Sequence, residues 1–237
     1  VTPTNEAINL HLDDKGRLCG IVERVPFARD TEYLVTLCKN SEDVKIALVQ
    51  RDACGVAYET NVAGEPRDQV SFEAVTPLNI ASVSAEFDPL KLKLMGALMR
   101  ATQMTGAIDT LLSMCISYAQ ERVAFERPIA KFQVIQHNLA IMAGELSAAL
   151  AATSAAEGAI LRDPNLGNEV FMNVASAKIR VGEAANEVSA IAHQLHGAIG
   201  FTKEHILHRF THRLWSWRDE YGSESKWAVL LGKNMIK

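Results

Sequence analysis

The sequence predicts an α+β protein in which a small antiparallel β-domain precedes an antiparallel bundle of four to five helices. Before residue 88, short β-branched runs alternate with clusters of turn residues. After residue 88, apolar residues recur at alternating steps of four and three, which is the period of a helix. We therefore predict a β-domain over residues 1–88 and a helical bundle over residues 89–237.

The first half of the chain contains four runs that are typical of strands. The predicted strands are about five to eight residues long, rich in Val, Ile, Leu and Thr, and bounded by Gly, Pro, Asn and Asp. The predicted strands fall within residues 17–25, 32–40, 43–51 and 69–77. The predicted turns are residues 13–16, 39–43 and 62–68. Together they indicate a small antiparallel sheet or a partial barrel.

The second half contains three long amphipathic segments. The first, 89–124, places an apolar stripe on one face: Leu94, Leu98, Ala101, Thr105, Ile108, Leu112, Cys115 and Ala119. The second has its own stripe: Phe132, Ile135, Leu139, Met142, Leu146 and Leu150. A third helix is predicted from about residue 167 to 194, followed by a break at 195–200 and two shorter helices. Helices this long and apolar bury more than one face, so we expect self-association.

Composition excludes several classes of function. The 237 residues carry a net charge of −4, with 22% charged residues, so nothing indicates nucleic-acid or anionic-membrane binding. We expect no membrane span, because no continuous run of about 18 apolar residues occurs. The four cysteines, Cys19, Cys38, Cys54 and Cys115, form no C-x-x-C pair. Reduced thiols in a cytoplasmic protein are therefore expected.

The segment 121–140, ERVAFERPIAKFQVIQHNLA, joins two of the predicted helices. Pro128 cannot lie inside a helix but suits the first turn of the next one. In one interpretation Arg122 caps the first helix, Phe125 fills the corner and Gln133 is a surface residue. In the other, the three residues form a site for a dinucleotide. A guanidinium pairs with phosphate oxygens, a phenyl ring stacks on a purine, and an amide both donates and accepts.

This segment resembles the acyl-CoA dehydrogenase signature R-x-x-F-G-x-P-I-x-x-F-Q-x-x-Q-x-x-L-A in residue type and spacing. A second segment, QLHGAIGFTKEHILHRFTHRL at 194–214, resembles the Q-x-x-G-G-x-G-[FY]-x-x-E segment of that family. GRLCGIVERVPFARDTEYLV at 16–35 is similar, more weakly, to its middle β-domain. The resemblance runs from about residue 16 to the end of the sequence.

The resemblance implies a flavoprotein oxidoreductase of fatty acid metabolism that oxidises the Cα–Cβ bond of an acyl-CoA thioester with FAD. It further implies an electron-transfer flavoprotein-type acceptor. The expected assembly is a homo-oligomer, either a dimer or a tetramer built as a dimer of dimers, or a heteromer with a related chain. By position, Arg122 would hold the FAD pyrophosphate, Phe125 would pack at the adenine and Gln133 would contact the adenosine. The resemblance also places Gln194, Gly197 and Ala198 at the same cofactor, from the neighbouring subunit.

The catalytic base is where the sequence departs most from the family. The family places a glutamate at one of two positions, which correspond here to Gly96 and Tyr221. Glu220 lies one residue before the second position, so we predict it as the base if the local geometry re-aims it. We expect Tyr221, Gly222 and Arg100 at the substrate, although surface or interhelical pairing of Arg100 stays an alternative.

Two further departures lie in the motifs. Glu126 and Ala198 replace glycines of the family pattern, and Glu126 makes a left-handed turn less easy. The printed sequence has no counterpart of the family's N-terminal helical domain or of the strand that opens its β-domain. This chain by itself is therefore not expected to form a complete active site.

Two alternative functions stay open. One is a non-catalytic or structural flavin-binding subunit that lacks the base. The other is a helical metal-binding protein, because His205, His208 and His212 would share one helix face. No closing carboxylate or thiol is clearly placed there, so we predict no metal site. Trp215, Trp217 and Trp227 are expected at a subunit contact.

Overall fold

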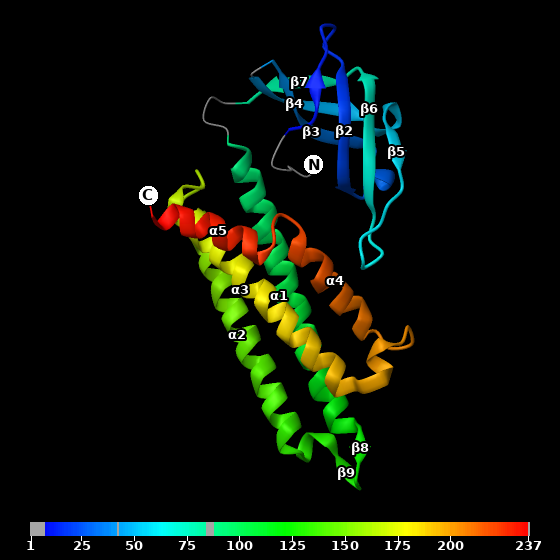
Figure 1. The fold of residues 1–237 in the computed structure, drawn as a ribbon, viewed down its shortest axis with the longest axis vertical. Coiled ribbons are helices and arrows are strands. Elements are labelled where there is room, and N and C mark those ends of the chain that lie inside the picture. Colours follow the sequence, from blue (N-terminus) through cyan, green and yellow to red (C-terminus); the bar gives the residue numbers. More distant parts are fainter. Residues whose placement is uncertain (1–7, 42, 84–87, 237) are drawn as a thin grey trace. The chain divides into compact units, whose positions relative to one another are not determined.

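The computed structural model describes residues 8–41, 43–83 and 88–236, and the chain divides into two compact units between Lys93 and Leu94 (Figure 1). The first unit holds the strands of one large sheet, and the second holds the helices. The four cysteines are free thiols. The α+β architecture agrees with the prediction.

The described part of the first unit forms a seven-stranded sheet of order β5-β6-β2-β1-β3-β4-β7 (Figure 1). Its strands are β1 (His11–Leu12), β2 (Leu18–Pro26), β3 (Tyr33–Asn40), β4 (Asp43–Gln50), β5 (Gly55–Ala57), β6 (Arg67–Val75) and β7 (Asn79–Ser82). Neighbouring strands pair antiparallel, except that β1 and β3 share one parallel pair, His11 with Lys39. The prediction missed β1, β5 and β7, because strands of two to four residues show no measurable alternation.

Alternation of side chains positions the core of the sheet. Along β3, Leu34, Thr36 and Cys38 are buried, whereas Tyr33 and Val35 face solvent at 49% and 37% exposure. This is the period of two that a strand with one buried face requires, and Leu37, which is also buried, is the exception to it. Leu34 and Cys38 pack in one cluster with buried side chains of β2, β4 and β6.

The described residues of the second unit form five α-helices: α1 (Pro89–Glu121), α2 (Gln133–Arg162), α3 (Asn168–His196), α4 (Leu207–Asp219) and α5 (Glu224–Met235). Helices α1, α2 and α3 lie alongside one another, α4 lies next to α3, and α5 crosses α3 near its beginning (Figure 1). All eight residues of the predicted stripe on α1 are buried. They pack with side chains of α2, α3 and α4 in one core.

Helix α2 departs from its predicted stripe in its second half. Leu150 is 48% exposed, and the buried positions are instead Ala149, Thr153, Ala156 and Ala159. Small side chains therefore form the contact with α3, which lets the two helices approach closely. By length and composition alone α2 would be able to cross a membrane, a test that core helices of water-soluble proteins also pass, and most of its apolar window is not buried. This apolar surface gives α2 room for a further packing partner.

Candidate functional site

The corner between α1 and α2 is a tight hairpin rather than a helix-to-helix turn. Strands β8 (Val123–Ala124) and β9 (Arg127–Pro128) pair antiparallel across Phe125 and Glu126. Both central residues have positive φ, 51° and 64°, which is the pattern of a type I′ turn. The prediction that Pro128 lies in the first turn of the next helix is wrong. Pro128 precedes a 3-10 turn, Ile129–Lys131, and α2 begins at Gln133.

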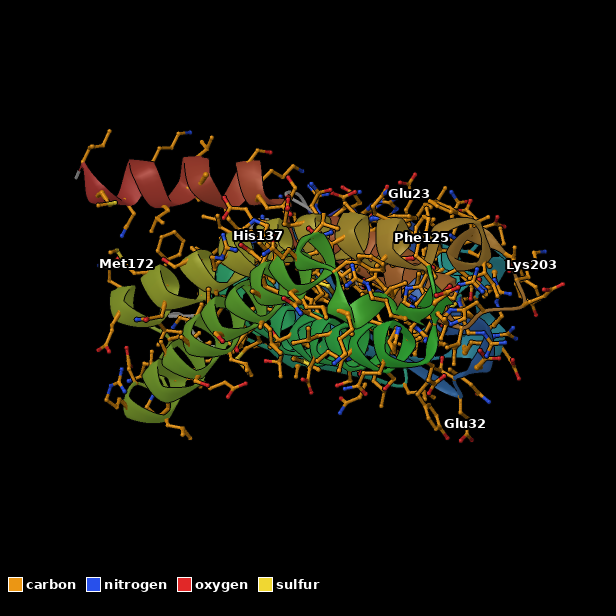
Figure 2. The ribbon with its side chains drawn as sticks, turned by 90° about the horizontal axis from the view of Figure 1, so that it is seen from below. Glu23, Glu32, Phe125, His137, Met172 and Lys203 are labelled. Atoms are coloured by element: carbon orange, nitrogen blue, oxygen red, sulfur yellow. The ribbon has the colours of Figure 1, made fainter. Side chains whose placement is uncertain are left out.

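The side chains at this corner face solvent. Phe125 is 89% exposed, and its only described ring contact is an edge-to-face one with Phe132 at 6.2 Å; Figure 2 labels it on the hairpin. Arg122 and Gln133 are also exposed, and neither side chain makes a hydrogen bond or ion pair to any described residue. Phe125 therefore does not fill the corner, and the Arg122 guanidinium does not cap α1. The three groups are accessible to a ligand.

The end of α3 presents backbone at the same end of the bundle. Gln194, Gly197 and Ala198 are exposed. Gly197 has φ 62°, and a Cβ built there would meet no atom within 4 Å, so a ligand has room to approach its backbone. The rings of Tyr118 and His196 stack with centroids 4.3 Å apart. Since Tyr118 lies one helical turn before Arg122, this contact brings the two motif segments together.

Histidines near this end are packed as aromatic rings. The His193 ring stacks on Phe201 at 4.3 Å, and its Nε2 lies 3.0 Å from Thr211 Oγ1. Burial lowers the pKa of His193 and of His196. In the neutral His196 ring, Nδ1 donates to the Ala192 carbonyl at 2.9 Å. These imidazoles are therefore held uncharged inside the fold.

The metal-binding alternative finds no support in this region. His205 precedes α4, which begins at Leu207, so the predicted shared helix face of three histidines is wrong. His208 and His212 do lie on α4, in edge-to-face contact at 5.8 Å. Among the described residues, no group of three or more His, Cys, Asp or Glu side chains is arranged to hold a metal ion.

The turn between α4 and α5, residues 219–223, holds the other predicted site residues. Glu220 accepts a hydrogen bond from Arg100 Nε at 2.6 Å, and the two side chains are 19% and 14% exposed. The Arg100 guanidinium also lies over the Trp217 ring at 5.3 Å. Tyr221 and Gly222 follow with positive φ, 57° and 107°. Arg100 therefore makes the interhelical pair that the sequence left as an alternative.

The two positions at which the family carries its base meet directly. A Cβ built on Gly96 would lie 2.3 Å from the Tyr221 ring, so the ring covers the bare backbone of α1. No carboxylate occupies either position. The carboxylate that the fold brings there is Glu220, which together with Arg100, Tyr221 and Gly96 forms one cluster. We call these four residues the α1–turn cluster.

Two residues that sequence reasoning did not assign to the site support this turn. Lys178 of α3 is fully buried, and its Nζ donates to the carbonyls of Arg218 at 2.5 Å and Gly222 at 2.9 Å. Trp227 donates from its indole to the Tyr221 carbonyl at 3.0 Å. Trp227 is buried within this chain, so its prediction as a subunit-contact residue is wrong. A lysine on the apolar face of a predicted helix was the available signal for Lys178.

The corner and the α1–turn cluster lie toward opposite ends of α1. Gly96 and Glu121 are 25 residues apart on one helix, which corresponds to about 38 Å at 1.5 Å per residue. The residues at the corner suit a flavin dinucleotide: a guanidinium without a partner among the described residues for phosphate, an exposed ring for a purine, and the open backbone at Gly197. The chemistry of these donors therefore fits FAD.

Comparison with known proteins places these features in a family. The model of the acyl-CoA dehydrogenase C-terminal domain matches residues 94–218. Acyl-CoA dehydrogenase IpdE2 of Mycobacterium tuberculosis is 32% identical over 117 residues, which are 49% of this chain and 34% of that protein. Human mitochondrial short-chain specific acyl-CoA dehydrogenase is 37% identical over 110 residues, 46% of this chain and 26% of that protein. The matches thus span about a third of the first relative and about a quarter of the second.

The fold of a solved structure covers the whole chain. The ChsE4–ChsE5 complex from Mycobacterium tuberculosis superposes with a TM-score of 0.86 at 17% identity, covering 100% of this chain and 65% of that one. At this identity the likeness concerns the fold. The family model, in contrast, matches more than half of the sequence and includes Arg122, Gln133 and Gly197. The chain therefore belongs to the acyl-CoA dehydrogenase family.

Proposed function

We propose that the chain acts in an FAD-dependent acyl-CoA dehydrogenase that oxidises the Cα–Cβ bond of an acyl-CoA thioester. The observation that carries the proposal is the Tyr118–His196 stack at 4.3 Å, which presents both motif segments at one end of the bundle. The exposed Arg122, Phe125 and Gln133 would hold the pyrophosphate and adenosine of the flavin. The bound flavin supplies the acceptor for the β-hydride.

The chain's own residues would act on the substrate at the α1–turn cluster. Glu220 would take the α-proton on its carboxylate, and Tyr221 and Gly222 would border the thioester. Arg100 now holds Glu220 Oε2 and so fixes the orientation of the carboxylate. If Arg100 turned toward an anionic part of the substrate, it would release that oxygen. Arg100 Nε donates to Glu220 and its Nη1 donates to Gln103, so a substrate anion would compete with these protein contacts for the guanidinium.

In the proposed assembly, the corner of one subunit and the α1–turn cluster of another act on one substrate. Within a chain the corner and the cluster are about 38 Å apart along α1. A flavin held at the corner of one subunit, where Gln194, Gly197 and Ala198 also lie, would therefore meet the α1–turn cluster of a neighbouring subunit, in a dimer or dimer of dimers. The exposed apolar surface of α2 is consistent with self-association. An electron-transfer flavoprotein-type protein would reoxidise the cofactor.

A second candidate is a flavin-binding subunit whose partner chain supplies the base. It is favoured by the state of the two family positions, because Gly96 has no side chain and Tyr221 covers it. The similar ChsE4–ChsE5 structure is a complex of two differently named chains. In this candidate the Arg100–Glu220 pair is structural, and acyl-CoA oxidation requires a related chain.

Glu220→Gln separates the two candidates. Glutamine keeps the shape and the acceptor for Arg100 but does not take a proton, so acyl-CoA-dependent reduction of bound flavin should fall by about 10²–10⁴-fold. Glu187→Gln, the same substitution at an exposed carboxylate of α3, is the matched control and should keep its activity. Undiminished activity of Glu220→Gln, or activity only after a partner chain is added, supports the second candidate. Purified protein that takes up no flavin contradicts both.

A further inference from the structure

Lys178 is the most unusual ionisable residue of the helical unit. Its side chain is fully buried in the middle of α3. Lysine is almost never buried in this way without compensation, because an ammonium loses its hydration. The compensation is three backbone carbonyls: those of Trp217 at 3.4 Å, Arg218 at 2.5 Å and Gly222 at 2.9 Å. All three belong to the end of α4 and the turn that follows.

Two of these carbonyls, those of Trp217 and Arg218, belong to the last turn of α4, and the third, that of Gly222, belongs to the turn beyond it. The last four C=O groups of a helix receive no intrahelical N–H. Here Tyr221 and Gly222 have positive φ and turn the chain away from the helix axis. The Lys178 ammonium, which comes from α3, donates hydrogen bonds to the carbonyl oxygens. The positive charge of Lys178 also lies at the negative, C-terminal end of the α4 dipole, where a cation is stabilising. The place where α4 stops is thus fixed from α3.

The same turn carries the candidate substrate residues. Glu220 and Tyr221 lie between Arg218 and Gly222, whose carbonyls Lys178 holds. The Trp227 indole also donates to the backbone of this turn, at the Tyr221 carbonyl. We call the contacts of Lys178 and Trp227 with this turn its two anchors. If either anchor moved, the Glu220 carboxylate and the Tyr221 ring over Gly96 would move together.

We propose that Lys178 is a positioning residue, which sets the turn 219–223 by holding the carbonyls of Arg218 and Gly222 and thereby aims Glu220 and Tyr221 at the acyl-CoA. This inference rests on the proposed function for the substrate and on the described contacts for the anchor. Lys178 acts through the turn and does not touch the reacting atoms.

The charge of the anchor makes the turn sensitive to alkaline pH. Burial lowers the pKa of Lys178 to about 8, and the charged groups that face it are Glu224 from α5, Asp219 and Arg218 from α4, and Glu220 from the turn. The three carboxylates oppose the shift, while Arg218 adds to it. A neutral amine has two N–H groups for three carbonyls. The turn should therefore loosen as the pH rises through about 8.

The test compares Lys178→Met with Met142→Ala in the full chain. Methionine has a volume similar to that of lysine but no N–H donor for the carbonyls. Met142→Ala removes buried side-chain volume from α2, at a site that is not part of the turn. Both variants lose stability. Only Lys178→Met should lower kcat/KM for an acyl-CoA, by about tenfold or more, with flavin still bound. Its pH profile should also lack the alkaline limb near pH 8.

A second readout keeps the anchor testable without activity. In the wild-type protein, the Gly222 amide resonance should titrate with a midpoint near pH 8, and Lys178→Met should abolish that titration. If the wild type turns over no acyl-CoA, the proposed function fails, while the Gly222 titration still tests the anchor. A Gly222 resonance that does not titrate, or that titrates equally in Lys178→Met, overturns the inference. So does an equal loss of kcat/KM in both variants.

Discussion

The two ends of α1 differ in how their polar groups are satisfied. At the corner, the Arg122 and Gln133 side chains have no described protein partner and Phe125 is 89% exposed. At the α1–turn cluster, Arg100 and Glu220 bind each other and the Tyr221 ring covers Gly96. A region whose groups are unpaired can bind a ligand without breaking protein contacts. A region whose groups are paired must rearrange, so its substitutions should affect stability and function together.

The largest expected effect is at Gly96. Gly96→Ala puts a methyl group 2.3 Å from the Tyr221 ring, which should destabilise the helical unit by about 2–3 kcal/mol in urea unfolding. Gly106→Ala on the same helix is the matched control, because its Cβ meets nothing within 4 Å. It should be neutral or stabilise by up to about 1 kcal/mol. In a Tyr221→Ala background Gly96→Ala should be tolerated. Equal stability of the two glycine variants would show that the ring does not cover Gly96.

The Arg100–Glu220 pair should give the next largest effect. Arg100→Met leaves a mostly buried carboxylate without this guanidinium, and we expect a loss of about 2 kcal/mol. Arg162→Met breaks the exposed pair with Glu169, whose side chains are 62% and 55% exposed, and should cost less than about 0.5 kcal/mol. A double variant with Glu220→Gln should lose less than the sum of the single ones. Strict additivity would mean that the two side chains do not interact in solution.

Acid should weaken the packing between α3 and α4. Burial lowers the pKa of His193 and His196 below 6.5, so below that value the unfolded chain binds more protons than the folded one. The free energy of unfolding should therefore fall as the pH drops below about 6.5, until the folded-state pKa values are passed. His193→Gln should flatten this dependence. His137→Gln, on the exposed face of α2 (Figure 2), should leave it unchanged. The same slope in all three proteins would count against buried, neutral imidazoles.

The smallest expected effect is at the corner itself. Glu126 has φ 64° at the second central position of the β8–β9 turn, where glycine meets no steric penalty. Glu126→Gly should therefore leave stability unchanged or raise it by about 0.5 kcal/mol. Thermal unfolding measures this. A loss above about 1 kcal/mol would indicate that Glu126 makes a stabilising contact that the structure does not show.

Much of the fold could be predicted from the sequence, because the periodic patterns of apolar residues extend over long segments. The eight-residue stripe runs from Leu94 to Ala119 of the 33-residue helix α1, so its period is unambiguous, and all eight side chains are buried. The buried face of α2 was harder to predict, because Ala149, Thr153 and Ala156 are buried there in place of Leu150. Small residues give only a weak hydrophobic periodicity. Strands such as β1, of two residues, exist only through their partners.

One part of the candidate site could be predicted from the sequence, and the other part could not. Arg122, Phe125 and Gln133 belong to one contiguous motif, so their presence at one corner was predictable. The contact of Gly96 with Tyr221, 125 positions apart in the printed numbering, depends on how α4 ends against α1. The anchor at Lys178 depends on which carbonyls that end exposes. No local pattern encodes either contact, because both are products of tertiary packing.

Binding of FAD to the full chain tests the central claim most directly. Titration calorimetry would compare the wild type with Arg122→Ala and with Arg162→Ala, an exposed arginine of α2 outside the corner. Loss of a guanidinium–phosphate pair should raise the Kd of Arg122→Ala by about tenfold or more, with its unfolding midpoint unchanged. Arg162→Ala should bind as the wild type does. The same Kd in all three proteins, or a wild type that binds no FAD, would contradict a flavin site at this corner.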